Sequence, residues 1–517
     1  MNPIATLTCL RRSESLSLDE RNYPSLPFSE SARIYINEMI EVDVHRQLLH
    51  LQRQETPFNP WPHQLTMGRL VARALHHGRS TLVQVSGSGE HRLSYLLPAL
   101  SGSQSVLLCL PEAIRTQVLE VELPLLRRYI PGDKPVGFGN RWPSSDWQGV
   151  YLTDPSIFLA DRLQGGSAFP KAIPVLFDCA HGLEQWATDC LEERILPADW
   201  DRLEPSDALL TWRARLSRSL LEQAQNRVVL FPTQEATLAK LLIPLSLDKN
   251  WQAFSDQLLQ TETLRTVEFY RASNQFSLLS TPIDVAPLLK ERLWPHQPVV
   301  IIGEALDPDR QAGTFRQRLG LGEMTCLRFP PDPREEEVVL YLPPKLLDLT
   351  SPVGQQELPA VIETLIAHAE ASMVILLNEG SLRQSLATEL AALYGSRVSV
   401  DTLRNQNNSI HLCSWEFWER HQRSLETPQI LVVCHLPFAN LDDPLIKARI
   451  ALCKQQRRDW FRSYLLPVML GRLQRGLSPL RRTQGLVALV DSRVNSRSYG
   501  QQLLDSLTPA RRLRYLE

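Results

Sequence analysis

The chain has 517 residues, with 55 Lys and Arg against 57 Asp and Glu, so its formal net charge is −2. This balance excludes a uniformly polycationic nucleic-acid-coating protein, and the 43% hydrophobic and 22% charged residues are ordinary for a soluble globular protein with large cores. No apolar run approaches the roughly 18 residues of a membrane span, and the N-terminus lacks a signal-peptide core. We therefore expect a cytoplasmic protein with no membrane contact.

The eight cysteines are scattered, and no two form a Cys-x-x-Cys pair. This spacing argues against a disulfide framework, a zinc ribbon or an iron–sulfur cluster. Cys179, His181 and Cys190 form the tightest group, but they lack a fourth ligand. We expect structural cysteines, with neither zinc nor an iron–sulfur cluster.

In chain order, residues 1–56 read as a polar leader followed by a helix. In residues 57–192, strands alternate with helices, which indicates a parallel sheet covered on both faces. The expected elements of this part are strands at 82–85, 106–110, 150–152 and 175–177 and helices at 64–75 and 114–128.

The strand pattern is largely lost in residues 193–275, where helical periodicity predicts a mainly helical insertion. Residues 276–331 return to the first domain, with a strand at 299–302. A proline- and charge-rich hinge at 332–337 then opens a second α/β series, which extends over residues 332–517. The strands expected there are 338–342, 373–377, 430–434 and 486–490.

Residues 80–98 have the order of a nucleotide-binding loop, namely an apolar strand, a glycine turn and a helical stretch. The turn is Gly87-Ser88-Gly89, and such turns aim backbone N–H groups and a helix N-terminus at phosphate. A working loop continues with Lys and then Ser or Thr. Glu90 and His91 stand at those two positions. The segment thus has the order of elements of an ATPase loop but lacks the residues that such a loop uses to bind and hydrolyse ATP.

The apolar strand before Asp178 places that carboxylate at the carboxyl edge of the predicted sheet, where α/β proteins bind ligands. Asp178 is therefore a candidate to hold a Mg²⁺-bound water. A helix N-cap is the plain alternative.

Residues 447–482 contain ten Lys or Arg against one acid, Asp459. This concentration favours a local polyanion contact, and a solvated helix face is the alternative. Aromatic residues lie among the basic ones, as in grooves that track phosphates and stack bases, although core packing explains aromatics at helical spacing equally well. The candidate nucleic-acid contacts are Arg457, Arg458, Trp460, Arg462 and Arg475.

Six segments, taken in order, resemble the DinG/XPD branch of the superfamily 2 ATP-dependent DNA helicases. They are Trp61-Pro-His-Gln-Leu-Thr-Met67, Asp178-Cys-Ala-His181, Ser280-Thr-Pro-Ile-Asp-Val-Ala-Pro-Leu-Leu289, Ser414-Trp-Glu-Phe-Trp-Glu419, Leu436-Pro-Phe438 with Asp443-Pro-Leu445, and Gly485-Leu-Val-Ala-Leu-Val-Asp-Ser-Arg493 with Tyr499-Gly500. The resemblance covers residues 57 to about 507. It implies an α/β protein with two RecA-like domains of the P-loop NTPase fold, ATP and Mg²⁺ between them, single-stranded DNA across their faces and 5′→3′ translocation.

The resemblance also assigns roles to individual positions. Nucleotide contacts are implied at Gln64, Gly87, Ser88, Gly89, Glu90, His91, Arg92 and Gln474, and catalytic remnants at Asp178, His181 and Arg481. Several positions depart from the family pattern: Glu90 and His91, Cys179 in place of the water-orienting glutamate, Gly303-Glu-Ala-Leu306 where Ser-Ala-Thr should couple hydrolysis to movement, and Leu477-Ser478 in place of Gly-Arg.

We expect these departures to weaken ATP hydrolysis. Replacing Lys by Glu turns an attraction into a repulsion of about 4 kcal/mol per charge pair at 4 Å and an effective dielectric of 20. We expect a DinG/XPD-like protein that binds nucleic acid, with single-stranded DNA favoured and RNA open, and with ATP hydrolysis weakened or lost. Two alternatives remain: an active 5′→3′ helicase that uses Arg92, Asp178 and Arg481, and a non-catalytic scaffold for a protein partner. Whether the chain is an enzyme stays open at this point.

Overall fold

The computed structural model describes most of the chain. The described residues are 30–54, 58, 61–86, 89–130, 132–204, 206–223, 225–258, 260–368, 372–404, 408–513 and 515, with the backbone alone for 30–39.

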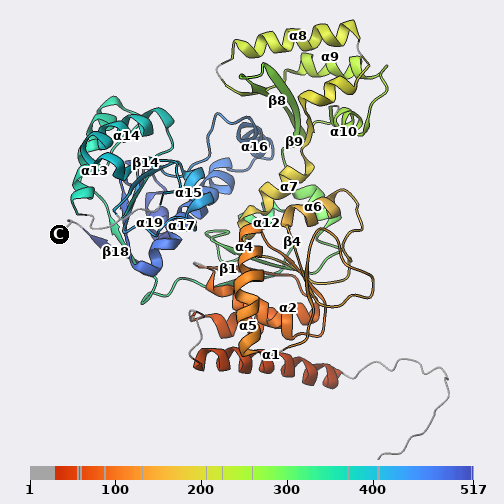
Figure 1. Ribbon diagram of the computed structural model, residues 1–517, viewed down its shortest axis with the longest axis vertical. Helices are drawn as coiled ribbons and strands as arrows, with labels where there is room; N and C mark the ends of the chain where they lie inside the picture. Colours follow the sequence, from red (N-terminus) through yellow and green to blue (C-terminus); the bar gives the residue numbers. More distant parts are fainter. Residues whose placement is uncertain are drawn as a thin grey trace, which may run out of the picture.

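The first domain is built on a parallel sheet of seven strands in the order β11-β1-β10-β5-β2-β4-β3 (Figure 1). Its strands are β1 (Thr81–Val85), β2 (Val106–Cys109), β3 (Val136–Phe138), β4 (Val150–Thr153), β5 (Val175–Phe177), β10 (Val299–Glu304) and β11 (Thr325–Arg328). Successive side chains enter separate cores, with Leu82 and Leu107 on one face and Val83 and Leu108 on the other. Burial on both faces explains why these strands read as continuous apolar runs.

Helices cover both faces of this sheet. They are α1 (Glu30–Arg53), α2 (Gln64–His77), α3 (Leu93–Ser101), α4 (Glu112–Gln117), α5 (Leu123–Tyr129), α6 (Pro155–Leu163), α7 (Leu183–Leu191), α11 (Ala286–Arg292) and α12 (Gly313–Arg318). The helix expected at 114–128 is interrupted by a π-turn at Val118–Glu122, between α4 and α5.

The second domain has another parallel seven-stranded sheet, in the order β14-β15-β13-β16-β17-β12-β18. Its strands are β12 (Val338–Tyr341), β13 (Met373–Leu376), β14 (Val398–Val400), β15 (Ile410–Cys413), β16 (Ile430–Val433), β17 (Leu486–Leu489) and β18 (Ala510–Leu513). The two parallel sheets confirm the predicted α/β fold class with two RecA-like domains.

The helices of the second domain are α13 (Pro352–Ala367), α14 (Gly380–Tyr394), α15 (Trp415–His421), α16 (Pro444–Gln455), α17 (Leu466–Thr483), α18 (Arg493–Ser496) and α19 (Gly500–Ser506). The helix α17 buries Leu470, Leu473, Leu477 and Leu480, whose spacing of three and four residues makes one apolar stripe. Trp415 of α15 is fully buried against this helix, so it belongs to the core.

The insertion contains helices, as we expected, but it is organised on a sheet that we did not expect. It contains an antiparallel sheet of four strands, β6 (Glu193–Ile195), β9 (Gln275–Pro282), β8 (Thr263–Tyr270) and β7 (Arg227–Val229), in that spatial order. The helices α8 (Asp207–Leu221), α9 (Pro232–Leu242) and α10 (Lys249–Leu258) pack on it around Trp200, Trp212 and Trp251. Cross-strand pairing along the β8–β9 hairpin outweighs weak local periodicity, and β9 runs through the expected boundary at residues 275/276.

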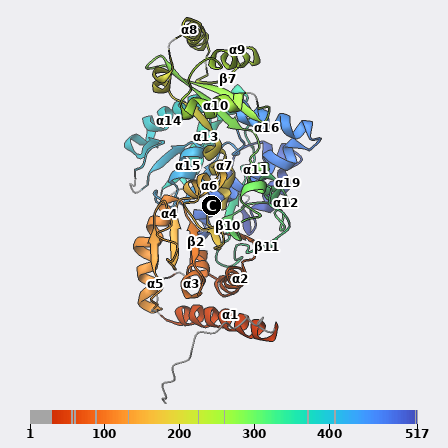
Figure 2. The same ribbon diagram turned by 90° about the vertical axis from the view of Figure 1, so that its right-hand side faces the viewer.

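The insertion and α1 lie at opposite ends of the long axis of the molecule, with the first domain between them (Figures 1 and 2). The second domain lies beside the first, and its helix α16 approaches the base of the insertion (Figure 1). Within the described residues, no helix is long and apolar enough to cross a membrane.

Candidate nucleotide cleft and nucleic-acid groove

The predicted phosphate loop lies between β1 and α3, at the carboxyl edge of the first sheet. Gly87 and Ser88 lie outside the described residues. Gly89 is in the left-handed region with φ of 100°, which favours glycine, and Glu90–Arg92 form one 3-10 turn before α3. The structure thus has the expected strand, β1, before Gly87 and Ser88, and the expected turn and helix, Glu90–Arg92 and α3, after them.

The charged residues of this turn are paired within the protein. Glu90 Oε1 lies 2.7 Å from Nη2 of Arg482, at the end of α17 in the second domain. Arg92 is buried, and its Nη2 lies 2.6 Å from Glu122 Oε1 on the π-turn. An Arg92 that replaced the missing lysine would first have to leave this buried ion pair.

Asp178 follows β5, is 1% exposed and uses both carboxylate oxygens within the chain. The Cys179 N–H donates to Oδ1 at 2.7 Å, His91 Nε2 lies 3.2 Å from Oδ1, and the Tyr95 hydroxyl donates to Oδ2 at 3.0 Å. Burial alone would raise the pKa of Asp178, but His91, Arg92 and the Cys179 N–H together hold that pKa well below its usual value. The carboxylate is therefore ionised and engaged by its own chain.

The other predicted residues of the first domain have distinct surroundings. The Gln64 side-chain oxygen accepts a hydrogen bond from Gln52 Nε2 at 2.9 Å, so the adenine-side glutamine is held by α1. Cys179 is left-handed with φ of 55°, and burial raises the pKa of its thiol, which keeps it neutral and unsuited to act as a base. His181 is exposed, on the side of Arg423 and Arg475 of the second domain.

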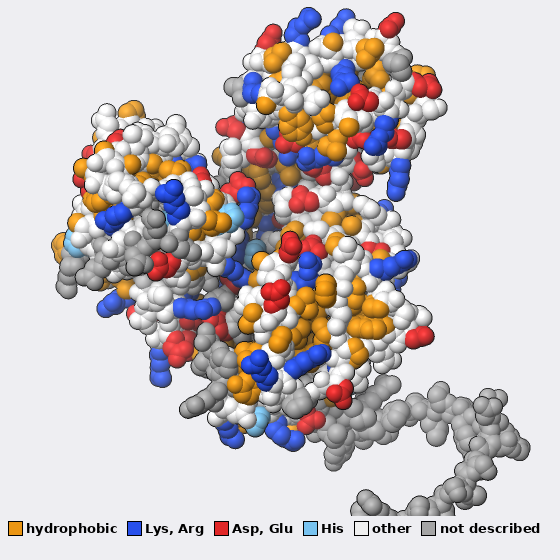
Figure 3. Space-filling view, viewed as in Figure 1, with side chains coloured by type: hydrophobic (Ala, Val, Ile, Leu, Met, Phe, Trp, Pro, Cys, Tyr) orange, Lys and Arg blue, Asp and Glu red, His pale blue; other side chains and the backbone are white. Residues whose placement is uncertain are grey.

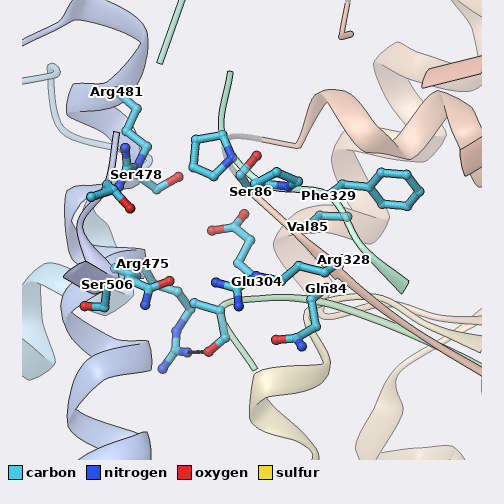
Figure 4. A pocket seen from close by; sticks show the side chains of 15 residues that line it. Gln84, Val85, Ser86, Glu304, Arg328, Phe329, Arg475, Ser478, Arg481 and Ser506 are labelled. Carbon is cyan, nitrogen blue, oxygen red and sulfur yellow. Dashed lines mark hydrogen bonds between the residues drawn. The ribbon is translucent and has the colours of Figure 1, made fainter. Parts of the chain in front are cut away.

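The helix α17 brings Gln474, Arg475, Ser478 and Arg481 to the domain junction (Figure 4). Arg481 is 4% exposed and donates to the carbonyls of Glu336, Leu507 and Pro509 at 3.0, 3.0 and 3.3 Å. Burial lowers the pKa of Arg481 to about 10. The predicted arginine finger is therefore anchored in its own domain.

Two adjoining cavities occupy the junction and share Glu304, Arg475 and Ser478. The first, of about 50 Å³, lies between Ser86 and α17, and Glu304 points into it (Figure 4). The second, of about 430 Å³, is also lined by Arg423 and Arg482. Burial raises the pKa of Glu304, which lies 3.7 Å from Arg423.

The residues present do not fit a Mg²⁺–triphosphate in this arrangement. Glu90 would set a carboxylate against the phosphates, His91 offers no hydroxyl, and both oxygens of Asp178 already lie at hydrogen-bond distance from groups of its own chain. Within the described ranges, no group of three or more His, Cys, Asp and Glu side chains could hold a metal ion.

The candidate nucleic-acid residues divide into two places. Arg457, Arg458, Trp460 and Arg462 lie together on the turn between α16 and α17, where Arg457 and Arg462 are exposed. The ammonium group of Lys454 lies 5.7 Å from the Trp460 ring centroid. Arg475 lies apart from this group at the domain junction, where it donates to the Ala305 carbonyl at 3.5 Å.

Much of the basic stretch is neutralised within the molecule. Arg449 lies 3.1 Å from Glu184, Arg472 lies 2.8 Å from Glu419, and Arg482 pairs with Glu90. Part of the positive charge seen in the sequence is therefore used in ion pairs at the domain junction. The exposed part of it is concentrated on the turn that carries Trp460.

Beside this turn lies a groove of about 1,150 Å³ in the second domain. Phe438 and Phe461 stack with ring centroids 6.0 Å apart, Tyr499 lies 5.3 Å from Phe461, and the Arg493 guanidinium lies 5.3 Å over Phe438. We call these three rings together with Trp460 the aromatic wall. Sequence reasoning did not assign Phe438 and Tyr499 to a site, although both stand in segments that carried the family resemblance.

Comparisons with known proteins agree with this architecture. Residues 357–510 match the family described as Helicase C-terminal domain. The chain is 27% identical to the ATP-dependent DNA helicase YoaA of Escherichia coli (strain K12) over 258 residues, which are 47% of this chain and 40% of YoaA. It is 22% identical to the 3′-5′ exonuclease DinG of Bacillus subtilis (strain 168) over 265 residues, which are 46% of this chain and 28% of that protein. The chain thus covers less than half of the length of these relatives.

Among solved structures, S. tokodaii Xpd4 is similar with a TM-score of 0.58 at 13% identity, covering 88% of this chain and 100% of that chain. The structure named XPD_APO is similar with a TM-score of 0.59 at 12% identity, covering 87% and 100%. The fold is that of a superfamily 2 helicase with two RecA-like domains. The chain is similar to DinG- and XPD-type helicases in sequence and fold, which confirms the resemblance predicted from the sequence.

Proposed function

We propose that this chain binds single-stranded nucleic acid on its second RecA-like domain, with ATP turnover greatly reduced or lost. The aromatic wall and its basic rim carry the proposal. A groove that combines stacked rings with exposed arginines suits a strand whose bases are unpaired, because each base offers a face for stacking and each phosphate a charge.

The composition of the groove sets the expected mode of binding. Its lining carries Glu379, Glu416 and Asp442 as well as Arg472, Arg493 and Arg497, so its own charges are balanced. Stacking on the aromatic wall then supplies much of the affinity, while Arg457 and Arg462 on the neighbouring turn add a salt-dependent part. No base-specific contact is needed for this mode.

Reduced ATP turnover is supported by the charges at the cleft. Glu90 repels a triphosphate where a lysine would attract it, and the Cys179 thiol is not a base. Arg481 donates to three backbone carbonyls, so it is not directed at a γ-phosphate. An active motor would need several of these groups to move at once.

The binding prediction is tested by fluorescence anisotropy with a labelled 20-nucleotide DNA and the matching RNA at several salt concentrations. Phe461→Ala should weaken binding by roughly 10-fold or more, as expected for the loss of a stacked base. The double variant Arg457→Ala/Arg462→Ala should weaken binding several-fold and flatten its salt dependence.

Arg215→Ala/Arg218→Ala on the exposed face of α8 is the matched control for charge, and it should bind as the parent does. Equal binding by all variants would contradict the groove assignment. Absence of binding by the parent chain at low salt would favour the scaffold alternative.

A further inference from the structure

We propose that the two RecA-like domains are held closed without a nucleotide, by carboxylates of the first domain that take the place of phosphate groups opposite arginines of the second. This inference concerns the domain junction and is independent of nucleic-acid binding. It rests on three observations at the junction: which domain provides the acid in each ion pair, where these acids lie, and how closely the two backbones approach each other.

All ion pairs between the two domains have the same polarity within the described part of the chain. In each of the three, the first domain provides the acid and the second the arginine. The pairs are Glu90–Arg482 at 2.7 Å, Glu184–Arg449 at 3.1 Å and Glu304–Arg423 at 3.7 Å. Charged side chains of both signs line the junction in the space-filling view (Figure 3). Because the negative charges lie on one domain and the positive charges on the other, the two faces attract each other.

Glu90 stands where the resemblance implies that nucleotide phosphates would lie, and Glu304, in the segment that replaces Ser-Ala-Thr, lies at the same edge of the sheet. Glu90 follows the glycine turn after β1, and Glu304 ends β10, where it is in register with Val85 at the end of β1. Both side chains are largely buried, with 15% and 13% exposed. They therefore bring fixed negative charge to the edge that a bound triphosphate would otherwise fill.

The third pair lies on another part of the junction and prevents the domains from pivoting about the first two. Arg449 of α16 donates to the Ile283 carbonyl at 3.1 Å and to the Thr188 hydroxyl at 3.0 Å, besides its pair with Glu184 of α7. The Arg449 side chain is 11% exposed. Contacts at separate places along the junction fix its angle as well as its distance.

The backbone of α17 also lies directly against the first domain. A Cβ built on Gly471 would lie 2.7 Å from the Ala305 carbonyl oxygen, so only glycine allows this approach. Ala305 itself is left-handed with φ of 48° and follows Glu304. The junction is thus packed as well as charged.

The test is a charge swap followed by small-angle X-ray scattering. The parent chain should have the same radius of gyration with and without Mg²⁺ and ATP at about 0.1 M salt, and a larger one near 1 M salt, where the Debye length falls to about 3 Å. Glu90→Arg and Arg482→Glu should each enlarge the radius of gyration at low salt, because each leaves two like charges facing. The double variant Glu90→Arg/Arg482→Glu should restore the parent value.

Glu389→Arg, an exposed change of the same charge on α14, is the control and should leave the radius unchanged. Circular dichroism checks that each variant is folded, and an unfolded single variant rescued by the swap would support the pair equally. Single variants as compact as the parent, a swap that fails to restore compactness, or compaction of the parent by Mg²⁺ and ATP would each overturn the proposal.

Discussion

At the scale of single residues, Asp178 shows how the cleft differs from the one that the family resemblance implies. Its two oxygens accept from a backbone N–H and from the Tyr95 hydroxyl and lie against the His91 ring. Buried carboxylates are tolerated only when such donors compensate the loss of water. Asp178, which the family resemblance assigns to Mg²⁺, is instead part of a buried hydrogen-bond network. His91, at the position of the missing hydroxyl, belongs to the same network.

Removal of one donor from this network should measurably destabilise the fold. Tyr95→Phe leaves Asp178 Oδ2 buried without its hydroxyl partner, so the free energy of unfolding should fall by about 1–3 kcal/mol. Urea denaturation gives this value. Tyr394→Phe, at a half-buried ring on α14, is the control and should change the free energy of unfolding by less than about 0.5 kcal/mol. A Tyr95→Phe effect no larger than that of the control would contradict the network.

At the scale of elements, α17 joins the two domains. One face of the helix packs into the core of the second domain through its leucines, and Gly471 and Arg475 lie against Ala305 of the first. The same helix carries the remnant motif of Gln474, Ser478 and Arg481. Its position therefore decides both the shape of the cleft and the docking of the domains.

Gly471→Ala should loosen the junction without changing any charge. The added methyl group would meet the Ala305 carbonyl at 2.7 Å, and overpacking of this kind costs about 1–3 kcal/mol. Arg334 is exposed in the hinge, and trypsin cleavage after it should become roughly 10-fold faster in the variant as the domains separate. Gly322→Ala, where a Cβ meets nothing within 4 Å, is the control. Equal cleavage rates in the two variants would contradict this role of α17.

The elements also show what the sequence could predict. Apolar runs bounded by turns located β1, β2, β4, β5, β10, β12, β13, β16 and β17, because strands buried on both faces have a strong local pattern. The β8–β9 hairpin was missed, although its run of β-branched and aromatic residues before a turn at Asn274 is a recognisable hairpin signal.

The site was predictable only in part, for a different reason. Motif positions such as Glu90 and Asp178 are visible along the chain, but their partners lie far away in sequence. The pair of Glu90 with Arg482 forms only when the second domain docks, and no local pattern indicates it. For the same reason, the charge excess of residues 447–482 looked more available for nucleic acid than it is.

For the whole molecule, these features describe a helicase fold whose domain junction is filled by its own charges. The first domain supplies the acids, one of them where the family resemblance implies phosphates, the second supplies arginines, and the aromatic wall of the second domain lines an open groove. Under the proposed function, the protein holds a single strand without the cycle of opening and closing that ATP turnover drives.

The most direct measurement is the rate of ATP hydrolysis at saturating single-stranded DNA, with DNA binding followed by anisotropy in the same sample. The parent chain should bind the DNA while its turnover stays at the level of Asp178→Asn, with no stimulation by DNA. DNA-stimulated hydrolysis on the order of 1 s⁻¹ or faster, typical of working enzymes and abolished by Asp178→Asn, would contradict the account.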